Sequence, residues 1–347
     1  MPPQGMLQQA SVTHRNVHQR GSAVLTRDEV IWGYRYILGR EPESEAVVNA
    51  TAAAVDNFRE FRRILLGSAE FDRICIQSRA SWFQRPVWVA APVFGGLRLL
   101  WIDLSDRFVS LGCLQDGYEL VETNFLKRIL RNDDVFLDIG ANVGWYTLLA
   151  STIIDSHGHI YAFEPHRPTV EYLQRTVALN NLNSLIDVYP IGLAKESKTE
   201  LLAWVAGTGN GGAASLGGNS VLQGMNTQSI EVRPLDSLGI ARVNVIKIDV
   251  EGAELLVMEG ATRILDRDRP IVMSEVLPGQ LQRVSGCTPE DYFGYFACRH
   301  YRAYILDTVR CGERIDTFPN PWHKELVNVA FIPGESPIDD CLFKALI

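Results

Sequence analysis

The sequence lacks the cysteine spacing of a zinc site or of a disulfide framework. Its 347 residues include six cysteines, which are scattered along the chain and form no C-x-x-C pair. Cysteines spread in this way are ordinarily reduced and mostly buried. We therefore expect no metal site built from thiolates and no network of disulfides.

The chain is also short of positive charge. It has 33 lysine and arginine residues against 41 aspartate and glutamate residues, which gives a formal net charge of -8. Proteins that bind nucleic acids draw on clustered lysine and arginine. This balance argues against a nucleic-acid partner.

A third absence is that of a long apolar run. The longest apolar region, residues 87–104, is interrupted by proline, glycine and charged residues, and residues 1–21 hold no continuous apolar stretch. Neither segment has the pattern of a membrane span or of a secretory signal. We expect no membrane span and a cytoplasmic location.

What is present is an ordinary globular composition, 46% apolar and 21% charged, in a chain long enough for two domains. Residues 1–24 are polar and aperiodic, which predicts a disordered tail. Thr26 followed by Glu29 has the spacing of a capping box ahead of apolar residues at helical spacing. We predict a small helical domain over residues 25–80 and a larger domain over residues 81–347.

The larger domain is organised around residues 135–149, VFLDIGANVGWYTLL. An apolar run ends at Asp138, passes through a turn containing Gly140 and Gly144, and enters an apolar helix. This pattern predicts a buried parallel strand feeding a nucleotide-binding helix. The glycines would let the backbone approach a ligand, and the helix N-terminus would offer N–H groups to a negatively charged group.

A second strand, residues 159–163, ends at Glu164, which could accept hydrogen bonds from both hydroxyls of a ribose. The dinucleotide fingerprint G-x-G-x-x-G is absent, since Asn142 stands where its second glycine would be, and this disfavours NAD or FAD. Asp138 suits a cation such as the ammonium of a methionine moiety. S-adenosylmethionine combines an ammonium, a carboxylate and a ribose. A glycine turn without any ligand is the alternative.

Strands and helices alternate further along the chain. Strands predicted over residues 186–190, 243–248 and 271–276 indicate a parallel, doubly wound sheet with right-handed crossovers. Two more strands, residues 302–306 and 327–333, complete the sheet.

The stretch from 207 to 228 is rich in glycine, serine and asparagine. A loop this long is usually functional or disordered, so it predicts either a mobile flap beside the pocket or plain disorder.

Lys247 and Asp249 share a face of an otherwise apolar strand. Two explanations stay open for them. They could form a satisfied buried ion pair, or Asp249 could face the substrate crevice at the carboxyl end of the strand with Lys247 behind it.

Three blocks of sequence resemble one known family. They are residues 137–144 (LDIGANVG), residues 163–165 (FEP) and residues 246–254 (IKIDVEGAE). In this order and spacing they resemble the FkbM-type methyltransferases, which are class I S-adenosylmethionine-dependent enzymes. The resemblance covers roughly residues 95–335. It implies methyl transfer, commonly to a hydroxyl oxygen, on a mostly parallel, seven-stranded, Rossmann-like sheet whose last strand is antiparallel.

The family often has an acid near the cofactor at the position of Glu119, although an acid that stabilises a helix N-terminus explains this residue equally well. The cofactor-binding residues that we expect are Glu119, Asp138, Gly140, Ala141, Asn142, Gly144 and Glu164. In the N-terminal part, residues 37–42 (ILGREP) and 68–71 (SAEF) resemble a short helical domain of unknown function that is appended to bacterial surface and polysaccharide-related proteins. A cap on the catalytic domain and a module that docks a partner stay open for it.

The sequence therefore predicts an S-adenosylmethionine-dependent methyltransferase that acts on a hydroxyl of a sugar, a glycan or a related metabolite. Asp249 is the first candidate for the base that removes the hydroxyl proton, with Glu275 and His323 in reserve. A divalent metal on Asp249 and a neighbouring carboxylate is conceivable but is not indicated. The rival hypotheses are an NAD-dependent oxidoreductase and a non-catalytic protein that binds a nucleotide or a glycan.

Overall fold

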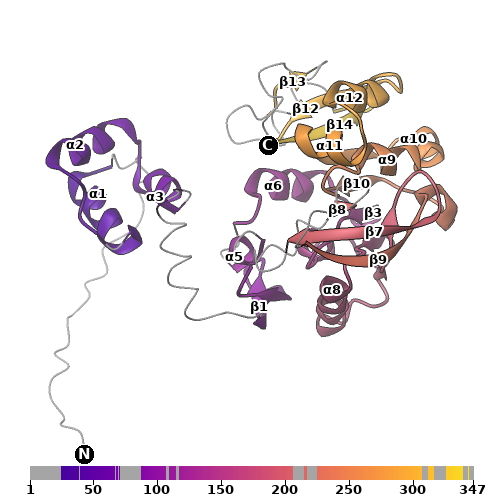
Figure 1. Cartoon of the computed structure of the whole chain (residues 1–347), viewed down its shortest axis with the longest axis horizontal. Coiled ribbons are helices and arrows are strands. Elements are labelled where there is room, and N and C mark those ends of the chain that lie inside the picture. The colour runs from indigo at the N-terminus through magenta and orange to yellow at the C-terminus, as the bar shows by residue number, and fades with distance from the viewer. Residues whose placement is uncertain are drawn as a thin grey trace, which may run out of the picture. The chain divides into compact units, whose positions relative to one another are not determined.

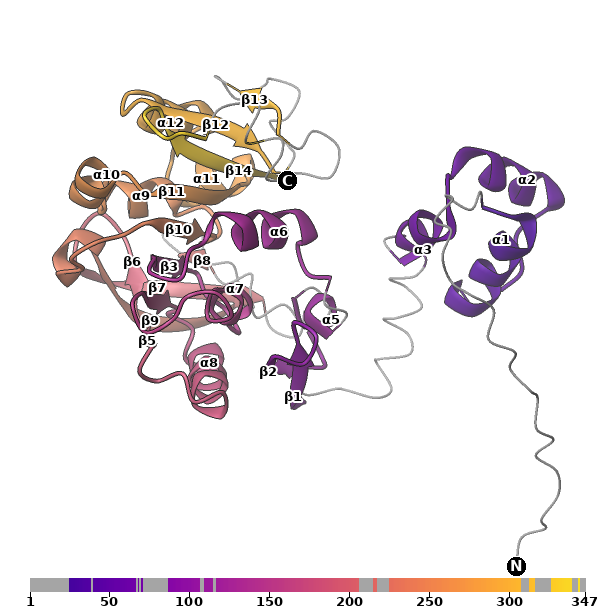
Figure 2. The same ribbon diagram turned by 180° about the vertical axis from the view of Figure 1, so that it is seen from behind.

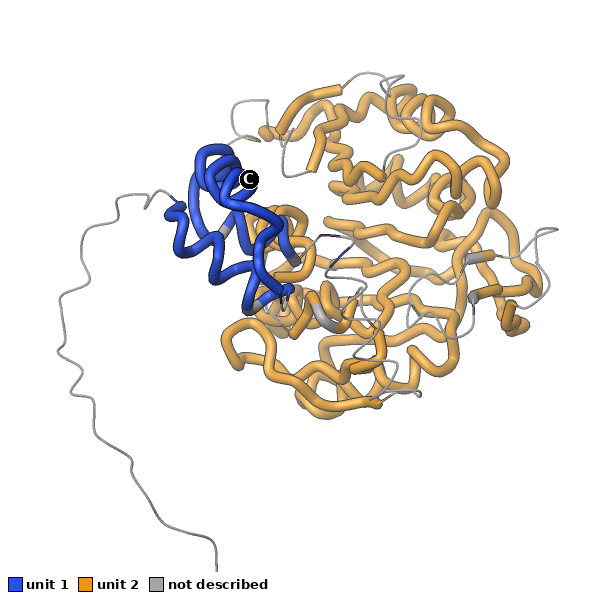
Figure 3. Tube along the Cα trace, turned by 60° about the vertical axis from the view of Figure 1, so that its left-hand side comes forward, with its two compact units in different colours: residues 1–84 blue, residues 85–347 orange. Residues whose placement is uncertain are grey.

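The computed structural model describes residues 25–38, 40–66, 68, 70, 87–106, 109–114, 117–205, 215–216, 225–306, 312–315, 326–338 and 343. The chain divides into two compact units, residues 1–84 and 85–347, which Figure 3 shows in different colours. The tail predicted over residues 1–24 lies outside the described residues.

Short helices make up the described part of the first unit. They are α1 (Arg27–Gly33), the π-helix η1 (Tyr34–Leu38), α2 (Glu45–Ala54) and α3 (Phe58–Leu66). The predicted capping box is confirmed, because the Thr26 N–H donates to Glu29 Oε2 at 2.8 Å and the Glu29 N–H donates to Thr26 Oγ1 at 3.3 Å. The helices bury a small core made of Leu25, Val30, Leu38, Val48, Phe61 and Leu65.

An eight-stranded sheet forms the centre of the second unit, and Figures 1 and 2 show it from opposite sides. Its strands are β3 (Val135–Ile139), β4 (His159–Phe163), β5 (Ile186–Tyr189), β10 (Val245–Ile248), β11 (Ile271–Val276), β12 (Tyr301–Ile305), β13 (Arg314–Ile315) and β14 (Val327–Pro333). They lie in the order β13-β12-β14-β11-β10-β3-β4-β5.

The five strands from β11 to β5 are parallel, as the alternation of strands and helices predicted. Numbered along the chain, these five follow the order 3-2-1-4-5, so the direction of winding switches between β3 and β10. β14 runs antiparallel to β11 and β12, which confirms the predicted antiparallel last strand. The predicted number of seven strands is wrong by one, because the two-residue strand β13 pairs with β12 at the edge. So short a strand leaves no periodicity in the sequence.

Each face of the sheet packs on its own apolar core, because side chains alternate along a strand. Leu137 and Ile139 of β3 belong to one core with residues of α9 (Glu254–Glu259), α10 (Thr262–Asp268), α11 (Pro278–Val284) and α12 (Pro289–Ala297). Phe136 of the same strand belongs to the other core. That core includes residues of the hairpin β1 (Trp88–Val93) and β2 (Arg98–Asp103) and of the helices α5 (Val109–Leu114), α6 (Leu120–Ile129), α7 (Trp145–Ala150) and α8 (Arg167–Leu179).

A smaller sheet has the order β6-β9-β7-β8. Its strands are β6 (Gly192–Leu193), β7 (Lys198–Val205), β8 (Ser215–Leu216) and β9 (Met225–Arg233). The loop predicted over residues 207–228 is therefore wrong at its described parts, since residues 215–216 pair with β7 and residues 225–228 belong to β9. These residues become strands by pairing with β7, which lies outside the stretch, and the composition of the stretch does not reveal that pairing. The rest of that stretch lies outside the described residues.

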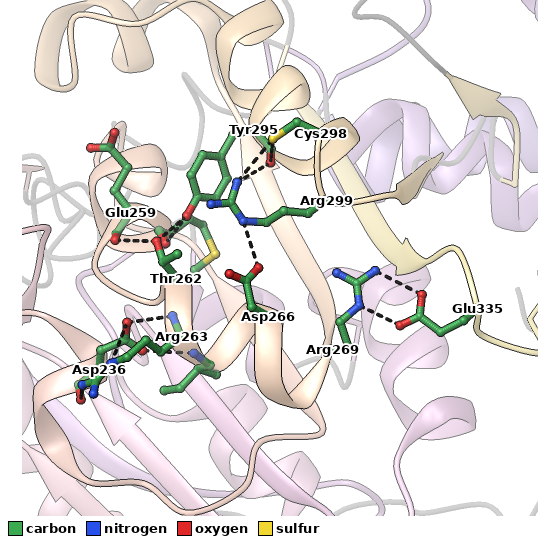
Figure 4. A network of polar contacts seen from close by, with 12 residues as sticks. Asp236, Glu259, Thr262, Arg263, Asp266, Arg269, Tyr295, Cys298, Arg299 and Glu335 are labelled. Carbon is green, nitrogen blue, oxygen red and sulfur yellow. Dashed lines mark hydrogen bonds and ion pairs between the residues drawn. The ribbon is translucent and has the colours of Figure 1, made fainter.

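Polar contacts connect the helices α9, α10 and α12 on the outer side of the second unit (Figure 4). The Tyr295 hydroxyl donates to the Met258 carbonyl at 2.7 Å and lies 3.0 Å from the Thr262 hydroxyl. Arg269 binds both carboxylate oxygens of Glu335, at 2.6 and 3.1 Å.

Within the described part of the chain, no helix has the length and apolar character needed to cross a bilayer.

Candidate active site

A pocket opens at the carboxyl ends of β3, β4 and β10. Its floor is made by residues 140–143 after β3, residues 164–165 after β4 and residues 249–251 after β10. This is the edge at which the order of the parallel strands switches, and ligands of such sheets bind there. Lys247 and the rings of Tyr118 and Tyr146 also line the pocket.

The glycine turn after β3 is tightly packed rather than open. Gly140 has φ +78°, and a Cβ added to it would lie 1.8 Å from the Asp249 carbonyl oxygen. Gly144 has φ +97°, and its Cβ would lie 2.5 Å from Leu173 Cδ1. Both glycines are thus required by protein packing as well as by backbone conformation, whereas the sequence pattern suggested that they make room for a ligand.

The N–H groups of this turn are mostly engaged within the protein. Those of Gly140 and Ala141 donate to the Phe163 carbonyl at 3.0 and 2.9 Å, and that of Gly144 donates to the Ala141 carbonyl at 2.9 Å. The Asn142 N–H donates to Glu164 Oε2 at 2.9 Å. Such a turn offers few donors to a diphosphate, which would need several.

Glu164 lies in the pocket wall at the end of β4, where the sequence predicted a ribose-binding acid. Its Oε1 accepts a hydrogen bond from the His166 N–H at 2.8 Å, while its Oε2 accepts the one from Asn142. Burial raises the pKa of Glu164 to about 7, although both hydrogen bonds oppose this shift. The two backbone donors fix the carboxylate, and its remaining lone pairs can accept further bonds.

Asp138 is completely buried and does not line the pocket. Its Oδ2 accepts a hydrogen bond from the Thr147 hydroxyl at 2.5 Å, and its Oδ1 has no hydrogen-bond partner. Burial raises its pKa, against the charge of Lys247, which lies opposite on β10. Asp138 therefore supports the turn from beneath, and its expected contact with an ammonium group stays a prediction.

Lys247 and Asp249 form an ion pair on the pocket wall. The Lys247 ammonium lies 3.3 Å from Asp249 Oδ2 and 3.4 Å from the Gly140 carbonyl oxygen, and its side chain is 8% exposed against 26% for Asp249. Burial lowers the pKa of Lys247, but the carboxylates of Asp249, Asp138 and Glu119 outweigh this and raise it. Both explanations left open for the pair therefore have support, because the ion pair is partly buried and Asp249 also borders the pocket.

The remaining predicted residues lie in different places. Glu119, at φ +42° before α6, accepts a hydrogen bond from the Tyr146 hydroxyl at 2.5 Å but does not itself line the pocket. Glu275, near the end of β11, is half-buried and outside the lining. Burial and then the carboxylates of Asp249 and Glu251 raise its pKa, which favours its protonated form. His323 lies outside the described residues.

Several pocket residues escaped the sequence reasoning. No role in the site was predicted for Glu251, yet it lines the pocket. An apolar wall also lines it, made by Phe163, Pro165, Ile191, Leu193, Leu202 and Leu216. The Glu251–Gly252 pair, three residues after β10, marks a turn at this edge, but nothing local shows that the acid faces the pocket. Nothing local indicated the wall, because part of it comes from the smaller sheet. Leu216 falls in the predicted flap, whose mobility stays a prediction.

Two deeply buried carboxyl groups predict an unusual dependence of stability on pH. Burial raises the pKa of Glu164 and Glu254 to about 7 from 4.5. A raised carboxyl pKa means that the folded protein binds protons which the unfolded chain releases, so stability falls as pH rises from about 4.5 to about 7. We expect the free energy of unfolding in urea to be larger at about pH 5 than at about pH 8, by roughly 1 kcal/mol or more.

The control for this prediction is Glu254→Gln, which removes one of these two carboxyl groups and should reduce the pH dependence. Equal stability at both pH values would show that these carboxyl groups titrate as they do in water.

Among the residues whose placement is described, no three histidine, cysteine or carboxylate side chains are grouped so that they could hold a metal ion.

An open, doubly wound sheet with a pocket at its switch point defines an α/β protein of the nucleotide-binding, Rossmann-like class. The family model described as "Methyltransferase FkbM domain" matches residues 138–315, which is more than half of the chain. The chain therefore belongs to the FkbM methyltransferase family.

Two relatives agree with this assignment. The chain is 27% identical to the hexuronic acid methyltransferase AglP of Haloferax volcanii over 137 residues, which are 38% of this chain and 52% of that protein. It is 28% identical to Methyltransferase 1 of Beauveria bassiana over 156 residues, 37% of this chain and 59% of that protein. The chain thus matches little more than half the length of either relative.

The crystal structure of an FkbM methyltransferase from Methylobacillus flagellatus is 18% identical, with a TM-score of 0.39, over 58% of this chain and 45% of that one.

Proposed function

We propose that the protein uses S-adenosylmethionine to methylate a hydroxyl oxygen of a sugar, a glycan or a related metabolite. The observation that carries this proposal is the composition of the pocket. Among the described residues that line it, the charged ones are three acids, Glu164, Asp249 and Glu251, and the cation Lys247. An excess of carboxylates favours a ligand with a net positive charge.

The cofactor fits this set of groups. Its ammonium and sulfonium outweigh its one carboxylate, so it is a cation, whereas the diphosphate of NAD is negative. The carboxylate of Glu164 suits the ribose hydroxyls. The apolar wall, including Pro165 and Ile191, suits the faces of an adenine ring. The engaged N–H groups of the turn after β3 argue against NAD, as does membership of a methyltransferase family.

When bound, S-adenosylmethionine supplies a methyl group already activated on a sulfonium. The chain's own residues must then hold the acceptor hydroxyl in line and remove its proton. Asp249 borders the pocket and is fixed by Lys247, so it can orient the hydroxyl by accepting a hydrogen bond. The pocket floor around Gly140 and Glu164 holds the cofactor.

The proposal of a sugar acceptor is supported by the relative that is named as a hexuronic acid methyltransferase. The FkbM family does not by itself fix the atom that receives the methyl group. A docking role for the N-terminal helical unit also stays a prediction.

Calorimetry tests the cofactor directly. We expect S-adenosylmethionine and its demethylated product to release heat on binding, and NAD to release none. Labelled S-adenosylmethionine offered with neutral and uronic methyl glycosides then reveals the acceptor class. Absence of heat with both sulfur nucleotides would remove this function, and binding without transfer to any hydroxyl compound would favour a non-catalytic binding protein.

A further inference from the structure

The turn that follows β10 is strained and firmly held. Glu251 has φ +55°, a conformation that costs a side-chain-bearing residue about 1–2 kcal/mol. Gly252 follows at φ +102°, and a Cβ on it would lie 2.4 Å from the Gln280 carbonyl oxygen. Strained residues of this kind persist only where their surroundings enforce them, and they gather at functional sites.

Buried groups enforce this turn from behind. Glu254, 2% exposed, accepts hydrogen bonds through Oε1 from the N–H groups of Val250 and Gly252, at 3.1 and 3.2 Å. The Ser285 hydroxyl donates to the Gly252 carbonyl oxygen. These contacts hold the backbone of Glu251 while its side chain borders the pocket.

We propose that Glu251 is the general base that takes the proton from the acceptor hydroxyl, an inference that rests on the methyl transfer proposed above. Its carboxylate borders the pocket beside Asp249, and its hydrogen bond from Gln280 Nε2 is long, at 3.4 Å. A loosely held carboxylate on a rigid backbone can turn toward a bound hydroxyl. A general base must first lie within reach of the proton that it removes, and its pKa is the second requirement.

The other carboxylates are less suited to this step. If Asp249 accepted a proton, the ion pair that neutralises the buried Lys247 ammonium would weaken. Glu275 lies outside the pocket lining, and its raised pKa favours the protonated form. Glu254 is committed to the two backbone N–H groups of the turn. Glu164 is held by two backbone N–H groups and is assigned to the ribose, so among the described acids of the pocket wall Glu251 remains for proton transfer.

The reaction balances with Glu251 as the acceptor of the proton. The hydroxyl proton moves to the Glu251 carboxylate, the oxygen's electron pair forms the new bond to the methyl carbon, and the electron pair of the broken carbon–sulfur bond stays on sulfur. The cofactor leaves as a neutral thioether, and the proton then passes from Glu251 to solvent.

The charges around Glu251 suit a base that works at neutral pH. Burial, followed by the charges of Asp249 and Glu254, raises its pKa to about 7, and the cations Arg283 and Lys247 oppose this. Glu275 is a further acid that faces it. Since a base must be deprotonated, turnover should rise as pH rises through about 7.

The test compares Glu251→Gln with Asp249→Asn, using the methyl glycoside that the unaltered protein methylates fastest. We expect Glu251→Gln to lower kcat by roughly 10²- to 10⁴-fold and to abolish the rise of kcat near neutral pH. Asp249→Asn should lower kcat less and keep that rise. Glu171→Gln on the exposed side of α8 is the matched control and should behave as the unaltered protein does.

Several outcomes would overturn the inference. These are unchanged turnover in Glu251→Gln, a rise with pH that survives in it, and a rise that disappears in Asp249→Asn instead. Calorimetry of each variant with S-adenosylmethionine separates this failure from that of the proposed function, since loss of the base leaves the cofactor bound. Should Glu251→Gln fail to fold, Glu251→Asp keeps a carboxylate and should keep the rise at reduced turnover; its absence would also overturn the inference.

A second readout needs no acceptor. Carbon-13 spectra of the glutamate carboxyl groups, compared between the unaltered protein and Glu251→Gln, identify the Glu251 signal. We expect this signal to titrate at about 7 rather than at the ordinary 4.5. Titration near 4.5 would contradict the proposal whatever the acceptor is.

Discussion

Gly140→Ala is expected to destabilise the second unit by about 2–5 kcal/mol and to abolish cofactor binding. The added Cβ would have to occupy a point 1.8 Å from the Asp249 carbonyl oxygen, at a residue whose φ is +78°. No side-chain rearrangement can relieve an overlap with backbone. The turns after β3 and β10 would have to move apart, and these two turns form much of the pocket floor.

A matched control separates the effect of the steric overlap from that of the positive φ value. Gly239 has φ +71° with nothing within 4 Å of its Cβ position, so Gly239→Ala carries the conformational penalty alone, about 1 kcal/mol. Urea unfolding measures both stabilities, and calorimetry measures cofactor affinity. If Gly140→Ala were no less stable than Gly239→Ala, the close approach of the two turns would not be required for the fold.

Glu164→Ala is expected to weaken the binding of S-adenosylmethionine by about 1.5–3 kcal/mol, which is roughly 10- to 150-fold. The variant loses hydrogen bonds from the ribose to a charged group. It also leaves the N–H groups of Asn142 and His166 without their acceptor, which loosens the turn after β3. Both effects act in the same direction.

Glu171→Ala, at an exposed position on α8, provides the comparison for this loss. Calorimetry at fixed pH gives the two dissociation constants. An affinity unchanged from that of the unaltered protein would place the ribose away from Glu164. If Glu164→Ala instead lost stability as well as affinity, this carboxylate would matter more for holding the turn after β3 than for binding the ligand.

The parallel part of the fold was predictable because its signals are local. Buried strands such as β3 and β4 are short apolar runs, each ending in an acid at a turn, and their period is fixed by backbone geometry. The smaller sheet was missed, since a glycine-rich segment becomes a strand only by pairing with β7.

The candidate site divides in the same way. Glu164 could be placed from sequence, because an acid at the tip of the second strand must lie beside the turn after the first. The role of Asp138 could not be predicted from the sequence, because its burial depends on Thr147 and on Lys247 of another strand. Glu251 was hidden for a related reason: whether an acid after a strand faces solvent or a pocket depends on the φ value that its neighbours enforce.

The family and the parallel strands with the turns that follow them could be predicted from the sequence, because each depends on residues close together in the chain. Which acids are available for chemistry depends on the folded structure. Asp249 is committed to Lys247, Glu254 to the backbone of a turn, and Glu251 to neither. The partners are near in sequence, but whether these contacts form depends on burial and on the backbone conformation of the turn after β10.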